Sequence, residues 1–319
     1  MMDIIIMGTA KSGKTSIKKV VFEKMPPHES VLNESTIQID PLQVESMGYA
    51  KICVTEFHTN FFLEKASISD QINQFFSSCG MLIYVFDSQD GTNAPFDYFR
   101  DNVMPLVQKY PKTSIAILTH KTDSVNINKN DLSKQKGEIQ TRFKDILSKS
   151  NTEISVSFYS TSIYDYSLFE TFSKIFQKMM PQNNLLSSLL DSLTMNCKFE
   201  KSYLFDVFNK IYLAVDSSPM EHQTYEICSD MIDVVLDMSG IYGEENGGES
   251  YFDANSMSLI KVSNCWKNDS DKSALYLRFI DSNLALIAIV SEENYDKPHL
   301  LNYNIEMFRN TVKKVLGKS

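Results

Sequence analysis

The sequence predicts two domains, a doubly wound α/β domain with a mostly parallel sheet and, after it, an α+β domain. Three observations lead to this fold class. The 319 residues exceed the roughly 100–200 residues of a common single domain. Through residue 180, short apolar runs alternate with amphipathic stretches, as strands and helices do in a parallel sheet. Pro181 and the amides after it interrupt this alternation, so we expect domains at 1–180 and 185–319.

The strands expected in the first domain are short apolar runs at 3–7, 50–57, 81–86, 114–118 and 154–159. The runs at 81–86 and 114–118 are nearly all apolar, as central strands covered on both faces should be. Amphipathic patterns typical of helices follow the runs, at 16–24, 68–77, 95–109, 129–148 and 164–179. Each expected strand is thus followed by a helix, which gives the doubly wound arrangement.

The second domain is expected to be an antiparallel sheet flanked by helices. Its helical patterns lie at 185–195, 225–238 and 301–316, and its strand patterns lie at 202–208, 211–216, 275–280 and 284–290. Glutamates between the glycines at 243–248 indicate a flexible loop within it.

The composition excludes several classes of protein. Hydrophobic residues make up 43% and charged residues 22% of the chain, which is typical of folded globular proteins. The net charge of -9 opposes broad binding to nucleic acid or to an anionic membrane surface, so no nucleic-acid partner is expected. The chain shows no signal peptide, no membrane-spanning run and no cysteine near its end for prenylation, so we expect no direct membrane insertion.

A phosphate-binding motif lies between the first expected strand and helix. The segment Gly8-Thr9-Ala10-Lys11-Ser12-Gly13-Lys14-Thr15 fits the pattern G-x-x-x-x-G-K-[ST]. Its glycines let the backbone wrap phosphate groups, and amides of the loop and of the helix N-terminus donate hydrogen bonds to them. Lys14 is expected to neutralise the β- and γ-phosphates, and the Thr15 hydroxyl to bind Mg²⁺. The residues expected around the phosphates are Gly8, Lys11, Ser12, Gly13, Lys14, Thr15 and Ser16.

A second motif follows the strand expected at 114–118. His120-Lys121-Thr122-Asp123 resembles the N-K-x-D guanine element of small GTPases, with His in place of Asn. The Asp123 carboxylate can accept hydrogen bonds from both the ring N–H and the amine of guanine, and the stem of Lys121 can cover the base. By itself, K-x-D after a strand is often only a solvated turn. Its place downstream of a phosphate loop favours a role for His120, Lys121 and Asp123 in base recognition.

Two shorter segments complete the expected site. Thr161, Ser162 and Ile163 lie where small GTPases support the base, although Thr161 or Ser162 is equally suited to cap the helix that follows. Thr36 lies between the first helix and the next strand, where a threonine would close over Mg²⁺ and the γ-phosphate. A lone threonine in a loop is usually a turn residue, and the order of the elements is what supports Thr36 as a ligand.

Together, these residues resemble the Rag GTPase family, in particular its RagC/RagD branch. In the first domain the resemblance includes Ser12-Gly13-Lys14, Glu34-Ser35-Thr36 and the H-K-x-D form that begins at His120. In the second domain, Leu204-Phe205-Asp206-Val207 and Asp216-Ser217-Ser218-Pro219 are similar to the same branch. The resemblance extends to about Gly243 and is weak beyond it.

The resemblance implies both a fold and a function. The fold is a P-loop small-GTPase domain followed by a roadblock/longin-like dimerisation domain. The site is implied to hold GTP or GDP with Mg²⁺, with Thr15 and Thr36 as metal ligands. The implied partner is a RagA/RagB-like GTPase in an obligate heterodimer, which signals amino-acid sufficiency to the target-of-rapamycin kinase complex. The chain is accordingly expected to be cytoplasmic and recruited to lysosomal or vacuolar membranes through partners, including a scaffold.

One motif departs from the family. The family carries D-x-P-G-Q after a strand, whereas this chain has Glu56-Phe57-His58-Thr59-Asn60 there. Glu56 can still hold Mg²⁺ through water, but the glutamine that positions the attacking water in Ras-like sites is missing. We therefore expect very slow intrinsic GTP hydrolysis and assign no catalytic residue. Two alternatives stay open: a pseudo-GTPase scaffold that binds nucleotide statically or not at all, and a P-loop kinase or ATPase, which guanine selectivity would exclude.

Overall fold

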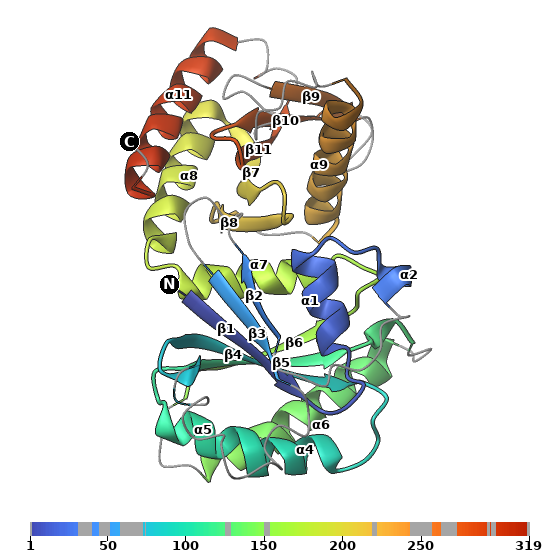
Figure 1. The fold of residues 1–319 in the computed structure, drawn as a ribbon. Coiled ribbons are helices and arrows are strands. Elements are labelled where there is room, and N and C mark those ends of the chain that lie inside the picture. The colour runs from blue at the N-terminus through green and yellow to red at the C-terminus, as the bar shows by residue number, and fades with distance from the viewer. Residues whose placement is uncertain are drawn as a thin grey trace. The chain divides into compact units, whose positions relative to one another are not determined.

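The computed structural model describes most of the chain (Figure 1). The described residues are 2–30, 40–44, 52–57, 73, 75–124, 129–149, 154–218, 222–242, 257–262, 273–291, 294 and 298–317. They fall into two compact units, of which one extends to Thr171 and the other begins at Phe172. This division falls within α7 (Ser167–Met179), whereas Pro181 lies in the turn before α8 (Asn183–Cys197). The domain boundary expected at 181–184 therefore stays a prediction.

The first unit contains a six-stranded sheet. Its strand order is β2-β3-β1-β4-β5-β6, and only β2 runs antiparallel to its neighbour among the described strands. The strands are β1 (Met2–Gly8), β2 (Asp40–Val44), β3 (Ile52–Glu56), β4 (Cys79–Asp87), β5 (Ser114–His120) and β6 (Val156–Thr161). The five strands expected from the apolar runs are confirmed, with shifted ends. The edge strand β2 was not expected.

Helices cover both faces of this sheet (Figure 1). On one side lies α1, and α4, α5 and α6 lie on the opposite side. The described helices are α1 (Lys14–Phe22), α2 (Pro27–Ser30), α4 (Ala94–Tyr98), α5 (Met104–Lys109) and α6 (Lys129–Ser148). A π-helical segment, Phe99–Val103, joins α4 to α5, so the helix expected at 95–109 is confirmed with an irregular centre. The helix expected at 68–77 lies mostly outside the described residues.

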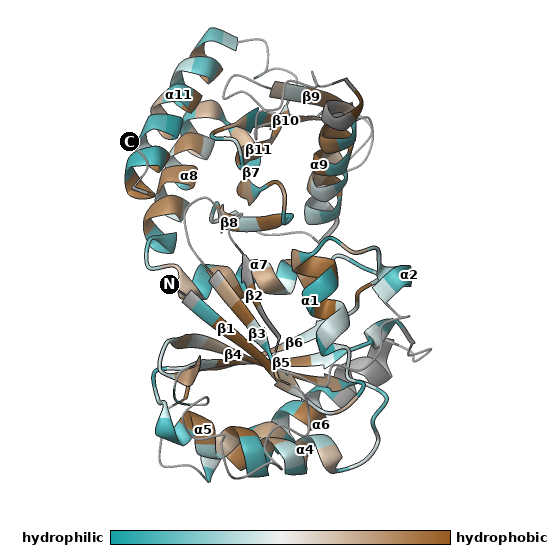
Figure 2. Cartoon of the chain, viewed as in Figure 1, coloured by the Kyte–Doolittle hydropathy of each residue, from teal (hydrophilic) through white to brown (hydrophobic). Residues whose placement is uncertain are grey.

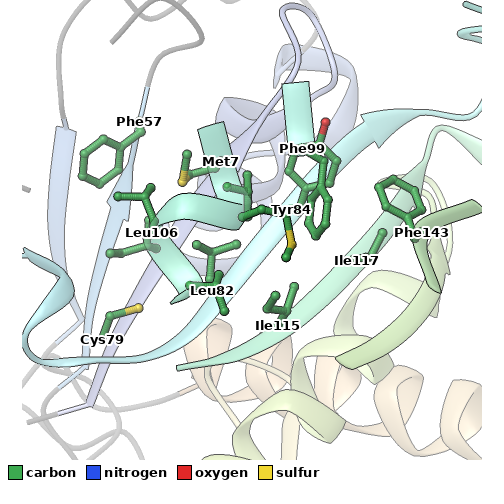
Figure 3. Packing of buried hydrophobic residues seen from close by; sticks show 14 of the residues in the cluster. Met7, Phe57, Cys79, Leu82, Tyr84, Phe99, Leu106, Ile115, Ile117 and Phe143 are labelled. Carbon is green, nitrogen blue, oxygen red and sulfur yellow. The ribbon is translucent and has the colours of Figure 1, made fainter. Parts of the chain in front are cut away.

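An aromatic cluster forms the core between the sheet and these helices (Figure 3). Tyr84 of β4, Phe99 and Phe143 of α6 pack against one another, with ring centroids 5.1 Å from Phe99 to each of the other two and 6.0 Å between Tyr84 and Phe143. The buried Tyr84 hydroxyl donates a hydrogen bond to the carbonyl of Pro95 at 2.6 Å, which satisfies the polar end of the side chain. This packing holds β4 and its neighbour β5 against the helices, and the C-terminal ends of both strands belong to the candidate site.

The second unit contains a five-stranded antiparallel sheet with the order β8-β7-β11-β10-β9. Its strands are β7 (Phe199–Asp206), β8 (Ile211–Val215), β9 (Met257–Val262), β10 (Ser273–Phe279) and β11 (Leu284–Ser291). Its helices are α8, α9 (His222–Tyr242) and α11 (Pro298–Val315), and α8 packs against α11, β7 and β8. The expected antiparallel sheet and helices are confirmed, whereas β9 was not expected and the loop at 243–248 lies outside the described residues.

The amphipathic pattern of α11 explains how the second unit buries this helix (Figure 2). Hydrophilic and hydrophobic residues alternate along it, and some large hydrophobic side chains are exposed. The buried side chains Leu301, Ile305, Phe308 and Val312 recur at spacings of three or four residues, which places them on one face. Among the described residues, no helix combines the length and the apolar character that a bilayer span requires.

A buried ion pair stabilises the second unit. Lys201 Nζ lies 2.8 Å from Asp216 Oδ1, and the side chains are only 6% and 2% exposed. The same ammonium donates hydrogen bonds to the carbonyl groups of Asp216 and Ser218. Burial of a charge is costly unless it is paired and hydrogen-bonded, and both conditions are met here.

Candidate nucleotide-binding site

The loop between β1 and α1 contains two positions that exclude a side chain. A Cβ atom added to Gly8 would lie 1.9 Å from the carbonyl oxygen of Val85. Gly13, which precedes α1, has φ of 95°, and a Cβ atom there would lie 2.6 Å from Cδ2 of His120. Glycine is therefore required at both positions, at Gly8 by close approach and at Gly13 also by a left-handed backbone. The result is a loop of exposed backbone ahead of a helix N-terminus, which suits phosphate groups.

Lys14 is the first residue of α1, and its side chain turns back into the loop. Its buried ammonium donates hydrogen bonds to the carbonyl of Thr9 at 2.8 Å and to that of Gly8 at 3.2 Å. Burial lowers the pKa of Lys14 to about 8, and the negative charge of Glu56 partly opposes this shift. An anion bound in the loop would favour the charged form of Lys14 further.

Thr15 and Glu56 bring two oxygen donors together beside Lys14. The Thr15 hydroxyl donates a hydrogen bond to Glu56 Oε1 at 2.7 Å, and Glu56 is only 1% exposed. Glu56 is the last residue of β3 and pairs in register with Ile6 of β1. Carboxylate and hydroxyl oxygens are hard ligands of the kind that Mg²⁺ prefers. One carboxylate and one hydroxyl fit a Mg²⁺ ion that is shared with phosphate oxygens, because Mg²⁺ at nucleotide sites commonly takes only one or two carboxylates from the protein.

Lys121 connects the guanine-type motif to the phosphate loop. Its ammonium donates a hydrogen bond to the carbonyl of Lys11 at 2.7 Å and forms an ion pair with Asp87 at 2.8 Å. Lys121 itself has φ of 60°, a strained conformation for a residue with a side chain. These contacts hold the segment after β5 against the segment after β1, as expected for parts of one binding site.

His120 fills the space between the phosphate loop and the end of β6. Its Nδ1 lies 2.9 Å from Oγ1 of Thr161, and the other edge of the ring faces Gly13. Burial, and next the charge of Lys121, lower the pKa of His120 to about 4. The ring is therefore neutral near pH 7 and acts as a polar spacer between the two loops.

Asp123 lies in a short 3-10 turn, Thr122–Ser124, and its carboxylate is held from one side. The Ser162 hydroxyl donates a hydrogen bond to Asp123 Oδ1 at 2.5 Å and accepts one from the Tyr164 N–H at 3.1 Å. The Ser162 N–H donates to the Ser167 hydroxyl at 3.0 Å. Asp123 itself is exposed. Its carboxylate is therefore oriented by Ser162 and accessible to solvent.

The structure brings together most of the residues expected from the sequence. The contacts described above join Gly8, Lys11, Gly13 and Lys14 to one another or to the guanine-type motif, and Thr15 contacts Glu56. Ser12 is buried, Ile163 is half-buried, and the Ser16 hydroxyl contacts the carbonyl of Ser30 at 3.4 Å. Thr36 lies outside the described residues. The binding roles of the set Gly8, Lys11, Ser12, Gly13, Lys14, Thr15, Ser16, Thr36, His120, Lys121, Asp123, Thr161, Ser162 and Ile163 stay predictions.

Sequence reasoning missed Asp87 and Ser88 at the end of β4. Asp87 stands opposite His120 in the β4–β5 register and pairs with Lys121. The Ser88 hydroxyl donates a hydrogen bond to the carbonyl of Lys121 at 2.9 Å, and its N–H donates to the carbonyl of His120. The available signal was positional, because polar residues that follow a buried parallel strand lie at the edge where ligands bind.

Comparison with known proteins gives the family of the chain. Residues 3–232 match the family described as Gtr1/RagA G protein conserved region. Ras-related GTP-binding protein C of Mus musculus is 37% identical over 98% of this chain and 76% of its own length. GTP-binding protein gtr2 of Schizosaccharomyces pombe is 36% identical, with 98% of each chain covered. The Saccharomyces cerevisiae protein GTR2 is 31% identical over 98% of this chain and 92% of its own length.

Relatives of a second type share less of the sequence. GTP-binding protein gtr1 of Schizosaccharomyces pombe is 24% identical over 64% of each chain. This identity is well below that of the RagC-type and Gtr2-type proteins, and it covers a smaller part of the chain. The chain therefore belongs to the Gtr1/Rag family of GTP-binding proteins, on the branch that includes RagC, RagD and Gtr2.

Proposed function

We propose that this chain is the guanine-nucleotide-binding switch subunit of a Rag heterodimer, with slow intrinsic GTP hydrolysis. The observation that carries the proposal is the link between the phosphate loop and the base-reading segment. Lys121 reaches Lys11, and the segment that contains Lys121 also presents Asp123, which Ser162 orients. A nucleotide with its phosphates in the loop would place its base beside Asp123.

The phosphate end of the site is served by the loop amides and by Lys14. The glycine positions leave the backbone open, and the ammonium of Lys14 is positioned to exchange its carbonyl partners for phosphate oxygens. Thr15 would hold Mg²⁺ from α1, with Glu56 beside it, and Thr36 is expected to join them when GTP is bound. The metal ion supplies neutralisation of the phosphate charge.

The base end of the site favours guanine over adenine. A carboxylate accepts hydrogen bonds from the ring N–H and the exocyclic amine of guanine, whereas adenine does not present this pair of donors. Each hydrogen bond to a charged group contributes about 1.5–3 kcal/mol, so two of them give roughly 100-fold or more in affinity. Asp123 is therefore the residue on which nucleotide identity depends.

Nucleotide identity can be tested directly. The chain is co-expressed with a RagA-type partner, and the purified pair is denatured so that chromatography identifies any released nucleotide. Because the partner is itself a GTPase, we expect two guanine nucleotides per native pair and one per pair with Asp123→Asn. The matched control is Asp145→Asn, which makes the same change at an exposed position of α6. An adenine nucleotide in addition to the partner's guanine nucleotide would contradict the proposal, and a folded dimer with only one guanine nucleotide would favour the pseudo-GTPase scaffold.

Slow hydrolysis follows from the residues at the end of β3. Glu56 takes the place of the aspartate of D-x-P-G-Q, and the sequence has no glutamine at the last position of that motif. Ras-like sites that have this glutamine hydrolyse GTP at only about 10⁻⁴ per second without an arginine finger. We expect a lower rate in single-turnover measurements on a purified heterodimer whose partner carries a variant phosphate loop that cannot bind GTP. A Ras-like or faster rate without an activating protein would contradict this part of the proposal.

The second unit is assigned to dimerisation with a RagA/RagB-like GTPase through a roadblock/longin-like fold. The antiparallel sheet with helices α8, α9 and α11 supports this assignment, and so does the similarity to both types of Rag protein. The heterodimer would act in amino-acid signalling to the target-of-rapamycin kinase complex. The chain would be cytoplasmic and reach lysosomal or vacuolar membranes through a scaffold that binds the heterodimer.

A pseudo-GTPase scaffold is the second candidate function. It is favoured by one observation, the replacement of the D-x-P-G-Q motif by Glu56-Phe57-His58-Thr59-Asn60. In that case the chain would hold nucleotide statically, or not at all, as the rigid half of the dimer. The exchange of bound nucleotide for a fluorescent analogue separates the two functions, since a static subunit would not exchange when its partner's regulators are added.

A further inference from the structure

We propose that Glu56 binds the nucleotide-associated Mg²⁺ directly, together with Thr15, and not through an intervening water. This inference rests on the proposed function, because it assumes that nucleotide and metal bind in the loop after β1. It concerns a residue that replaces the shorter aspartate of the family pattern, so the metal site of this chain would differ from a water-bridged one. The argument uses the position of Glu56, its contact with Thr15, and its burial.

The backbone of Glu56 is fixed at the end of β3. Glu56 pairs in register with Ile6 of β1, and the N–H of Phe57 donates a hydrogen bond to the Ile6 carbonyl at 3.0 Å. Phe57 is itself buried and packs edge-to-face against Phe75 with ring centroids 5.7 Å apart. The strand is therefore anchored on both sides of Glu56. Glutamate has one methylene more than aspartate. Because the backbone is held in place by the sheet, this extra length brings the carboxylate closer to α1.

The contact between Glu56 and Thr15 has the spacing of two neighbouring metal ligands. Mg²⁺ binds oxygen at about 2.0–2.1 Å in octahedral geometry, so two adjacent ligand oxygens lie about 3 Å apart. Glu56 Oε1 and Thr15 Oγ1 are 2.7 Å apart. If these two oxygens moved slightly apart, both would bind one Mg²⁺ as neighbouring ligands of the octahedron. The hydroxyl group would turn its lone pair toward the metal.

The electrostatics of the site favour the same arrangement. Glu56 is 1% exposed, and a buried carboxylate needs a cation nearby. In this structure the charges of Glu56 and Lys14 attract each other. When Lys14 turns to the phosphates, a divalent cation beside Glu56 would compensate the carboxylate. Sites for Mg²⁺ with nucleotide commonly use one or two carboxylates in addition to phosphate oxygens.

The number of water molecules on the metal tests this proposal. The heterodimer is purified with a partner variant whose phosphate-loop lysine is replaced, so that only this chain binds nucleotide. It is loaded with GDP and Mn²⁺, which takes the same oxygen ligands as Mg²⁺ and is paramagnetic. The broadening of its electron paramagnetic resonance lines in water enriched in the magnetic oxygen isotope counts the bound waters. GDP is used because Thr36 is expected to approach the metal only with a γ-phosphate. With Thr15, Glu56 and one phosphate oxygen as ligands, we expect about three waters.

The matched variants are Glu56→Asp and Glu138→Asp. Aspartate at position 56 is too short to reach the metal, so we expect about four waters, whereas Glu138 is exposed on α6 and its variant should keep three. About four waters in the unmodified protein would overturn the direct contact and leave nucleotide binding intact. Failure of the unmodified protein to form any complex with GDP and Mn²⁺ would overturn both this inference and the proposed function. The count for the unmodified protein decides the matter even where Glu56→Asp does not fold.

Discussion

Gly13→Ala should destabilise the chain because the added methyl group has no space and the backbone does not suit alanine. The φ of 95° at Gly13 costs a residue with a side chain about 1–2 kcal/mol. The new Cβ would lie 2.6 Å from Cδ2 and 3.0 Å from Nε2 of His120. That ring is buried and hydrogen-bonded to Thr161, so it cannot move aside freely, and overpacking of this kind costs about 1–3 kcal/mol. The sum is about 2–5 kcal/mol.

Denaturant unfolding of the full chain without nucleotide, followed by circular dichroism, measures this loss. Gly91→Ala is the matched control, because no atom lies within 4 Å of its added Cβ, and it should change stability by less than about 0.5 kcal/mol. Equal unfolding midpoints for the two variants would refute the reasoning. A double variant with His120→Ala separates the two contributions, since removal of the ring relieves the clash and leaves the backbone cost.

Three further predictions concern buried charges. The pKa of His120 is about 4 in the folded chain, below its ordinary value of about 6.5. Between these two pH values the unfolded chain binds more protons than the folded chain does. The free energy of unfolding should therefore fall as pH is lowered through that range. His120→Gln should remove most of this slope in denaturant unfolding at a series of pH values. The pKa of Lys14 is about 8, and bound phosphates favour its charged form, so nucleotide binding near pH 8 should take up protons. Calorimetry in buffers of different ionisation enthalpy measures this uptake. Equal binding enthalpies in all buffers would contradict it. Lys201→Met leaves Asp216 buried without its cation and should lower the free energy of unfolding by about 3–5 kcal/mol. Asp233→Ala removes one partner of a partly exposed ion pair and should lower it by less than about 1 kcal/mol in the same assay.

The elements that the sequence predicts well are those whose burial is complete. β4 and β5 are covered on both faces, so their apolar runs are continuous and easily found. β2 is different because it is a short edge strand that contains Pro41 and pairs only with β3. Proline is tolerated in an edge strand but otherwise argues against a strand, so composition indicated a loop there. β9 lies at an edge of its sheet with exposed or half-buried side chains at 257–260, which weakens its pattern, whereas β8 at the other edge is mostly buried and was predicted.

A motif could be predicted where all its residues lie in one continuous segment, as in the phosphate loop. Contacts between the ends of different strands could not be predicted, because they depend on strand register. Asp87 meets Lys121 only because β4 and β5 place Asp87 opposite His120. The contact of Thr15 with Glu56 depends in the same way on the pairing of β3 with β1. No sequence spacing encodes either distance.

The described geometry separates nucleotide binding from nucleotide hydrolysis. Under the proposed function, contacts to the nucleotide itself would come from the loop after β1, from Lys14, and from Lys121 and Asp123, whereas Glu56, the first residue of the altered segment, would act on the bound Mg²⁺. Hydrolysis requires in addition a positioned water, and the glutamine that supplies this in Ras-like sites has no counterpart in the sequence. Loss of an interaction made only in the transition state lowers the rate without weakening ground-state binding. A subunit of this construction would therefore retain the nucleotide that it receives, and its state would change mainly when nucleotide exchanges or when a partner supplies the missing catalytic group.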